Sequence, residues 1–202
     1  GFQAFQNEEQ LKFVDAKEPV QILSKEDAIR SILLTEQIGD FLWNKLYKRE
    51  LFCAIRFPEG RVMEDLGTTY RLLECCEKIA YRTSPLYFYY QREDSTLHLR
   101  KRRFYEDKLD MGLMRYYDLK KKNICCLEND AAMLNNVEHC YPYLVLDPMR
   151  KAQMEQFLNG FEPKALKLMN RSSQRKYKLL KLNRSLYTKL FLLKNGPAAE
   201  EQ

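Results

Sequence analysis

The spacing of apolar residues predicts a helix in the first part of the chain. Ser24 is followed three residues later by Asp27, as at a helix N-cap, and apolar side chains recur at helical spacing over residues 28–33. Glycine often follows a helix because it adopts backbone conformations that other residues avoid. We therefore expect a helix over about 25–35, with Gly39 ending it.

A second helix is predicted between residues 64 and 76. Leu66, Tyr70 and Leu73 recur every three or four residues, which places them on one face of a helix. Two acidic residues stand at its start, where they suit the positive end of the helix dipole. The segment is therefore expected to be an amphipathic helix with an acidic first turn.

Short extended segments are expected around these two helices. Residues 41–52 are rich in aromatic side chains and alternate only in part, which favours a short strand that leads into one helical turn. The sequence Phe-Pro-Glu-Gly at 57–60 has the composition of a turn. Two further β segments are expected over 78–81 and 86–90, separated by the Ser-Pro pair at 84–85.

The rest of the chain, from about residue 96, has long helical patterns and few helix breakers. No internal repeat or low-complexity tract is present. The predicted fold is therefore α+β and mostly helical. The expected helices cover residues 100–121, 127–138, 148–159, 163–170 and 172–194.

The composition is that of a globular chain. It has 202 residues, of which 45% are hydrophobic and 31% charged, and no stretch approaches the roughly 18 consecutive apolar residues of a membrane span. Only 7 residues are glycine, and neither G-x-G-x-x-G nor G-x-x-x-x-G-K-[ST] occurs. A complete dinucleotide-binding or P-loop enzyme is therefore excluded, and no secretory signal is expected at the N-terminus.

The cysteines and histidines do not predict a metal site. No C-x-x-C spacing occurs, adjacent cysteines do not chelate one ion from a helix, and only His98 and His139 are left to complete a site. Free thiols in a reducing compartment are expected, and acid–base chemistry would have to use carboxylates. The six cysteines are Cys53, Cys75, Cys76, Cys125, Cys126 and Cys140.

The positive charge is concentrated near the C-terminus. The net charge is +6, yet residues 164–194 hold ten basic and no acidic residues, so the rest of the chain is net acidic, with 24 basic and 28 acidic residues. This asymmetry favours an anionic partner. The ten basic residues are Lys164, Lys167, Arg171, Arg175, Lys176, Lys178, Lys181, Arg184, Lys189 and Lys194.

Leucines in the same segment recur every three or four residues, and most of the basic residues fall outside their stripe. This pattern predicts a basic amphipathic helix, which suits the surface of an anionic membrane. An alternative is that the leucine stripe packs on the preceding helices and the lysines are merely solvated. Nucleic acid is not favoured, because too few aromatic residues accompany the charge. The stripe consists of Leu179, Leu182, Leu186, Leu190 and Leu193.

Three sequence blocks point to a known family. They are WNKLYKRELF at 43–52, IRFPEGRVMEDLGTTYRLL at 55–73 and SPLYFYYQREDST at 84–96. In this order and spacing they resemble the C-terminal half of bacterial family 2 glycosyltransferases of the GT-A fold. The resemblance is strongest over 43–96 and extends, by general pattern, over 20–100.

The resemblance assigns Glu64 and Asp65 to the family's catalytic "ED" motif. In that motif the aspartate is the general base that deprotonates the acceptor hydroxyl during an inverting sugar transfer. A carboxylate within hydrogen-bond reach can take that proton as the new bond forms. The alternative is that both acids only stabilise a helix N-terminus.

Asn44 and Lys45 match the family's "NKLY" block, which implies a place for them in substrate binding. Lys45 would add positive charge there, although an ordinary ion pair with Glu50 is the alternative. Trp43 is the only tryptophan and suits stacking on a sugar face, while a half-buried core position is equally compatible with its sequence context.

Gln91, Arg92 and Ser95 match the family's "YxYxxRxxS" block, which lies near the sugar nucleotide. Arg92 is the natural partner of the diphosphate, because a guanidinium binds phosphate oxygens through two parallel hydrogen bonds. An ion pair with Glu93 is the alternative for Arg92.

The nucleotide-binding half of such enzymes, with its Asp-x-Asp metal motif, has no counterpart here. Residues 13–17 resemble the metal loop only faintly, since Lys17 occupies the place of the second acid. The resemblance therefore implies the acceptor-side half of a longer enzyme, inactive on its own. Mg²⁺ or Mn²⁺ would be held by the other half, and none by this chain.

These inferences divide the chain into three parts. Residues 1–98 would be the C-terminal part of a GT-A domain, 99–195 a helical subdomain and 196–202 a frayed tail. The expected partners are a nucleotide-sugar donor and a saccharide or lipid-linked acceptor of envelope polysaccharide synthesis, with a cytoplasmic location, peripheral on the inner face of the membrane. The alternative function is a non-catalytic helical module that binds a membrane surface or another protein.

Overall fold

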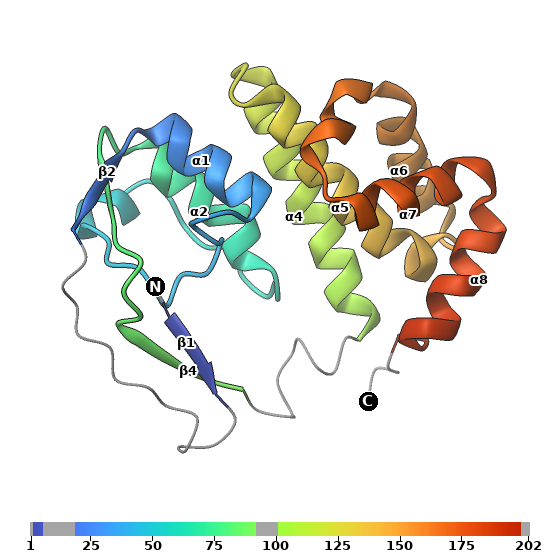
Figure 1. Cartoon of the computed structure of the whole chain (residues 1–202), viewed down its shortest axis with the longest axis horizontal. Helices are drawn as coiled ribbons and strands as arrows, with labels where there is room; N and C mark the ends of the chain where they lie inside the picture. Colours follow the sequence, from blue (N-terminus) through green and yellow to red (C-terminus); the bar gives the residue numbers. More distant parts are fainter. Residues whose placement is uncertain (1, 6–18, 92–100, 199–202) are drawn as a thin grey trace. The chain divides into compact units, whose positions relative to one another are not determined.

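The computed structural model describes residues 2–5, 19–91 and 101–198 (Figure 1). The chain forms two compact units, one of residues 1–59 and 64–99 and the other of residues 60–63 and 100–202. Most of the described residues are helical and few are in strands, so the expected helix-dominated α+β class is confirmed.

The first unit is built on α1 (Lys25–Leu34) and α2 (Glu64–Glu74), which pack together. The two predicted helices are thus confirmed. The Ser24 side chain accepts a hydrogen bond from the Asp27 N–H at 3.1 Å, as an N-cap should. The core holds the apolar stripes of both helices: Ala28, Ile29, Ile32, Leu33, Leu66, Tyr70, Leu72 and Leu73.

Helix α1 ends within a residue of its predicted end at 35, but Thr35 ends it and not Gly39. Thr35 adopts a left-handed conformation with φ 55°. The buried hydroxyl of Ser31 then accepts hydrogen bonds from the N–H groups of Gln37 and Ile38, both at 2.9 Å. The serine hydroxyl thus binds the main chain just after the helix, which turns away at Thr35.

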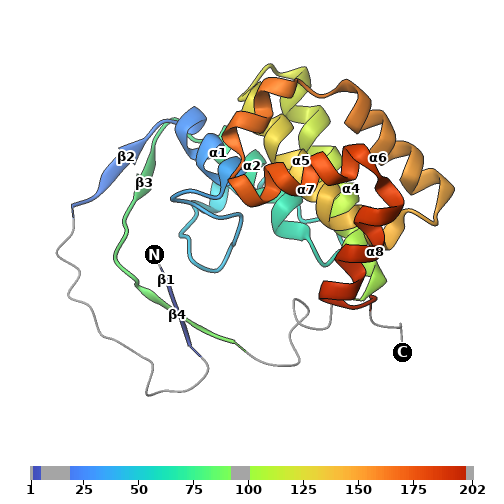
Figure 2. The ribbon, with the colours of Figure 1, turned by 45° about the vertical axis from the view of Figure 1, so that its right-hand side comes forward.

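Two short sheets complete the described part of this unit (Figure 2). Strand β1 (Phe2–Phe5) pairs in parallel with β4 (Tyr87–Tyr90), and β2 (Gln21–Leu23) pairs antiparallel with β3 (Ile79–Tyr81). The two β segments predicted near 78–81 and 86–90 are therefore confirmed.

The strand predicted within 41–52 is wrong. Only the helical turn at its end forms, as the 3₁₀ helix η2 (Arg49–Phe52). The Lys45 ammonium donates hydrogen bonds to the main-chain oxygens of Gly39 and Phe41. Carbonyls bound by a side chain are not available to a strand ladder, and the segment therefore folds as a loop.

The second unit is a bundle in which α5 contacts each of the other helical segments. Leu134, Val137 and Leu144 of α5 are fully buried. The predicted helix over 163–170 is a 3₁₀ helix and the others are α-helices. The segments are α4 (Arg102–Lys121), α5 (Cys126–Leu144), α6 (Pro148–Gly160), η3 (Pro163–Leu168), α7 (Arg171–Leu182) and α8 (Arg184–Asn195).

Helix α5 continues six residues beyond its predicted end at 138, through Pro142. Proline has no N–H, so the carbonyl of Glu138, four residues earlier, loses its helical partner. The buried hydroxyl of Tyr187 in α8 donates a hydrogen bond to that carbonyl at 3.0 Å. A contact from a distant helix thus satisfies the group that the proline leaves unpaired, and it anchors α8 on α5.

The single basic helix predicted over 172–194 is two helices. Asn183 has φ −153° and ψ 98°, which ends α7, and its side chain accepts a hydrogen bond from the Leu186 N–H at 2.9 Å, which caps α8. The bundle is contacted by Tyr177, Leu180 and Tyr187, which are buried. Most of the predicted leucine stripe is exposed, so the alternative that the stripe packs on the preceding helices is wrong.

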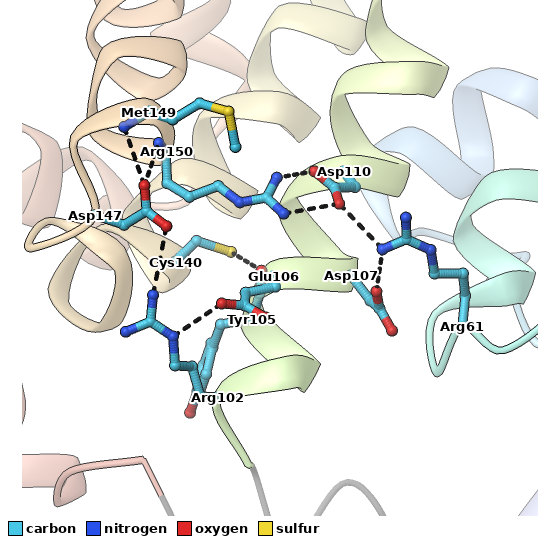
Figure 3. A network of polar contacts seen from close by, with 10 residues as sticks. All are labelled: Arg61, Arg102, Tyr105, Glu106, Asp107, Asp110, Cys140, Asp147, Met149 and Arg150. Carbon is cyan, nitrogen blue, oxygen red and sulfur yellow. Dashed lines mark hydrogen bonds and ion pairs between the residues drawn. The ribbon is translucent and has the colours of Figure 1, made fainter. Parts of the chain in front are cut away.

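A network of ion pairs ties the segment 60–63 to α4 and α6 (Figure 3). The Arg61 guanidinium binds the carboxylates of Asp107 at 2.5 Å and Asp110 at 3.1 Å. Arg150 binds Asp110 through two nitrogens, and the Val62 N–H donates to Asp107 at 3.0 Å. Because both aspartates are bound by arginines, we interpret this cluster as structural: it holds the segment 60–63, α4 and α6 together.

Within the described ranges, every helix is too short or too polar to cross a lipid bilayer. The six cysteines are free thiols.

Candidate functional site

The first turn of α2 presents two acidic side chains. Glu64 and Asp65 are both half-buried there. One oxygen of the Asp65 carboxylate accepts a hydrogen bond from the Leu66 N–H at 2.7 Å. The positive end of the helix dipole lies at the same place and favours the ionised carboxylate. A partly accessible carboxylate is thus held at a defined position.

A loop over residues 39–47 is folded around one ammonium group. Lys45 Nζ donates hydrogen bonds to the Gly39 carbonyl at 2.7 Å, to the Phe41 carbonyl and to the Asn44 side-chain oxygen at 2.9 Å. Main-chain groups and Asn44 thereby hold Lys45, rather than the ion pair with Glu50 that the sequence left open. Lys45 shapes the loop and positions its neighbours.

This loop is bound to α2. The hydroxyl of Thr69, a fully buried residue of α2, donates a hydrogen bond to the Asp40 carbonyl at 2.6 Å. The carboxylates of Asp40 and Asp65 both act electrostatically on the Lys45 ammonium. Burial, together with the same two carboxylates, raises the pKa of the Tyr47 phenol. The carboxylates of Asp40 and Asp65 thus influence both the Lys45 ammonium and the Tyr47 phenol.

Burial lowers the pKa of Lys45 from its ordinary value of 10.5 to about 8, and Asp40 and Asp65 oppose the shift. Above pH 8 the folded chain therefore releases a proton that the unfolded chain keeps until pH 10.5, so stability rises with pH across this interval. The quantity to follow is the unfolding free energy of the wild type minus that of Lys45→Met. We expect this difference to increase by about 1 kcal/mol between pH 7.5 and 9.5, after allowance for partial solvent exposure.

Urea unfolding followed by Trp43 fluorescence at the two pH values measures this increase, because Trp43 lies in the first unit. Lys48→Met, at an exposed lysine of the same loop region, is the matched control and should show no such pH-dependent difference. Equal pH dependence in the two variants would contradict a proton loss at Lys45.

Trp43 joins the loop to strand β4. Its indole stacks on Tyr89 with a centroid distance of 4.7 Å and an interplanar angle of 4°, and it contacts Tyr87 at 4.6 Å. Phe41 stacks on the same indole at 5.2 Å. Since three aromatic rings already contact the indole, the structure favours a packing role for Trp43 over stacking on a sugar.

Besides Trp43 and Glu64, described above, the structure brings together some of the predicted site residues and not others. Lys45 is bound to Asn44, and Asp65 lies close enough to act on its ammonium. Gln91 is exposed directly after β4. Arg92 and Ser95 lie outside the described residues, as do residues 13–17.

Sequence reasoning missed Asp40 and Thr69 and gave no role to Tyr47. Asp40 lies five residues before Lys45, but this spacing alone does not bring two side chains together, so it gave no signal. No signal marks Thr69, whose role depends on a contact across 29 residues of sequence.

The described part of the chain holds no group of three or more His, Cys, Asp or Glu side chains suited to a metal ion.

No protein-family model matches the chain, and neither the curated proteins nor the solved structures include a match. A function is therefore argued from the sequence blocks and from the site residues.

Proposed function

We propose that this chain is the acceptor-side part of an inverting glycosyltransferase similar to the bacterial family 2 enzymes of the GT-A fold. Residues 1–98, with their short sheets, would be the C-terminal part of the GT-A domain, and 99–195 a helical subdomain. The donor is a nucleotide sugar, and the acceptor is a saccharide or a lipid-linked saccharide of the cell envelope. The reaction would take place on the cytoplasmic side of the membrane.

One observation carries the proposal. The three blocks that resemble the family lie apart in the sequence, yet side chains of the first block interact with both of the others. Lys45 of the first block is affected electrostatically by Asp65 of the second. Trp43, also of the first, stacks on Tyr89 of the third. A resemblance that reflected only helix-forming composition would not require these contacts.

The proposed chemistry is base catalysis by Asp65. An acceptor hydroxyl that reaches this carboxylate gives up its proton as its oxygen attacks the anomeric carbon of the donor sugar, and the nucleoside diphosphate leaves with the bonding electrons. The nearby Lys45 ammonium favours the ionised form of Asp65, which is the form that accepts a proton. Lys45 is thus a positioning residue in this scheme, because it also orders the loop.

The family resemblance also implies a divalent metal, Mg²⁺ or Mn²⁺, which would stabilise the charge of the departing diphosphate. The described residues do not form a group that fits such an ion. Since the sequence contains no Asp-x-Asp motif, the proposal places the ion in the donor-side half.

A transfer assay on the protein at the length made by its host tests the proposal. Labelled UDP-, GDP- and TDP-sugars are supplied with Mg²⁺ or Mn²⁺, together with oligosaccharides or a lipid extract from the host. We expect label to pass to an acceptor with inversion at the anomeric carbon, and chelation of the metal to abolish transfer. Absence of both transfer and nucleotide-sugar hydrolysis with every donor would contradict the proposal.

A further inference from the structure

Helix α8 has apolar side chains on two sides. On its inner side Tyr187 is 2% exposed, and the Phe191 ring lies 5.9 Å from that of Tyr143 in α5. On its outer side Leu186, Leu190 and Leu193 are 43, 48 and 74% exposed. The inner side alone accounts for packing on the bundle. These three leucines form what we call the outer face.

Positive charges border this outer face. At 3.6 residues per turn, Lys189 and Lys194 lie on either side of the leucine row of α8. The preceding helix α7 carries Lys178 and Lys181, and all four lysines are exposed. None of the four forms an ion pair with a residue that the structure describes, whereas Arg184 is bound to Glu155 at 2.5 Å and belongs to the fold.

The combination of leucine and lysine suggests one kind of partner. Protein interfaces are enriched in aromatic residues and arginine and depleted of lysine. A nucleic acid would leave the leucines without a contact. An anionic bilayer suits both residue types, because leucines enter the boundary between headgroups and acyl chains while flanking lysines meet lipid phosphates.

We propose that the outer face of α8 is a docking surface for an anionic lipid bilayer. The helix would lie in the plane of the interface, held to its own unit by Tyr187 and Phe191 and to the membrane by the leucines and lysines. This surface belongs to the helical unit, and the membrane proposal does not depend on the transferase proposal. An experiment can therefore contradict one of the two proposals without contradicting the other. It would bring an acceptor-side domain to the place where lipid-linked saccharides are found.

Flotation of the full chain with vesicles tests the surface. We expect binding to vesicles of phosphatidylcholine and phosphatidylglycerol in a ratio of about 7:3, weak binding to pure phosphatidylcholine, and a loss of binding as salt screens the charges. Each lysine near the surface contributes a factor of about five to partitioning. Two combined variants should each weaken binding by about tenfold or more. They are the double variant Lys189→Glu/Lys194→Glu and the triple variant Leu186→Ser/Leu190→Ser/Leu193→Ser.

Matched controls come from the same unit. Leu146→Ser alters a leucine that is 89% exposed outside the outer face, and Lys151→Glu alters an exposed lysine of α6. Both should bind like the wild type. The changed side chains of all variants are exposed, and unchanged far-UV circular dichroism verifies that the helices remain.

Equal binding to neutral and anionic vesicles, or leucine and lysine variants that bind like the wild type, would overturn the proposal. Failure to bind vesicles, together with a concentration-dependent dimer that the leucine variant abolishes, would also overturn it and assign the outer face to a second copy of the chain.

Discussion

Replacing Asp107 by alanine is expected to lower the free energy of unfolding of the helical unit by about 2–3 kcal/mol. The Asp107 side chain is 2% exposed and accepts from the Arg61 guanidinium and the Val62 N–H. Its removal leaves the Val62 N–H without this partner and weakens the hold of α4 on the segment 60–63. Arg61 keeps Asp110 and is partly exposed, which limits the loss.

Asp118→Ala is the matched control for this prediction. Asp118 is in the same helix and forms an exposed pair with Lys122 at 2.9 Å, and such pairs contribute about 0.5 kcal/mol or less. Urea unfolding monitored at 222 nm compares the two variants, since the second unit contains most of the helix. Similar losses in both variants would mean that the buried network does not stabilise the unit.

Helical periodicity predicted the parts of the fold that depend on local sequence. The stripe of Leu66, Tyr70 and Leu73 is buried as expected, and Ser24 caps α1. The hydrophobic stripe and the N-cap both depend on residues within one or two helical turns of each other, and the sequence pattern therefore reveals them.

The predictions failed where a hydrogen bond from a side chain decides the backbone conformation. Periodicity does not reveal that Lys45 takes two carbonyls of its own loop, which prevents the predicted strand. Nor does it show that Tyr187 satisfies the carbonyl left unpaired by Pro142, which lets α5 run on. In each case the deciding hydrogen bond comes from a side chain that the local pattern does not place.

The basic segment shows the same limit in a different form. The leucine spacing predicted one continuous helix. Asn183 instead caps the start of a second helix, a position where asparagine is common. The face that packs is then marked by Tyr177, Leu180 and Tyr187. A regular stripe indicates amphipathicity without indicating which of two apolar faces is buried.

The candidate site could be predicted from sequence only through the family resemblance. That resemblance singled out Asp65 and Lys45, whose charges interact in the structure. Asp40 and Thr69 became visible only with the fold, because their link depends on a loop that closes onto α2.

Replacing Asp65 by asparagine is expected to lower kcat for sugar transfer by a factor of about 10² to 10⁴, the usual contribution of a positioned general base. The asparagine side-chain oxygen can still accept the hydrogen bond that the Leu66 N–H gives to Asp65. The amide is nearly isosteric with the carboxylate but does not accept a proton at neutral pH. The variant should therefore fold normally, as Trp43 fluorescence verifies, and bind the donor normally.

Glu77→Gln is the matched control for this substitution. Like Asp65→Asn, it replaces an acid by its amide, but at an exposed position beyond the other end of α2. A change in activity in this variant would indicate a general effect of charge rather than a role of the carboxylate at the start of the helix.

The most direct test of the central claim, that Asp65 is the base of a sugar transfer, is kcat measured on the native-length enzyme and its Asp65→Asn variant. The expected result is a fall of about 100-fold or more, with the donor KM and the Glu77→Gln activity within about threefold of the wild type. A kcat for Asp65→Asn within about threefold of the wild type would contradict the assignment, because a general base contributes far more than that.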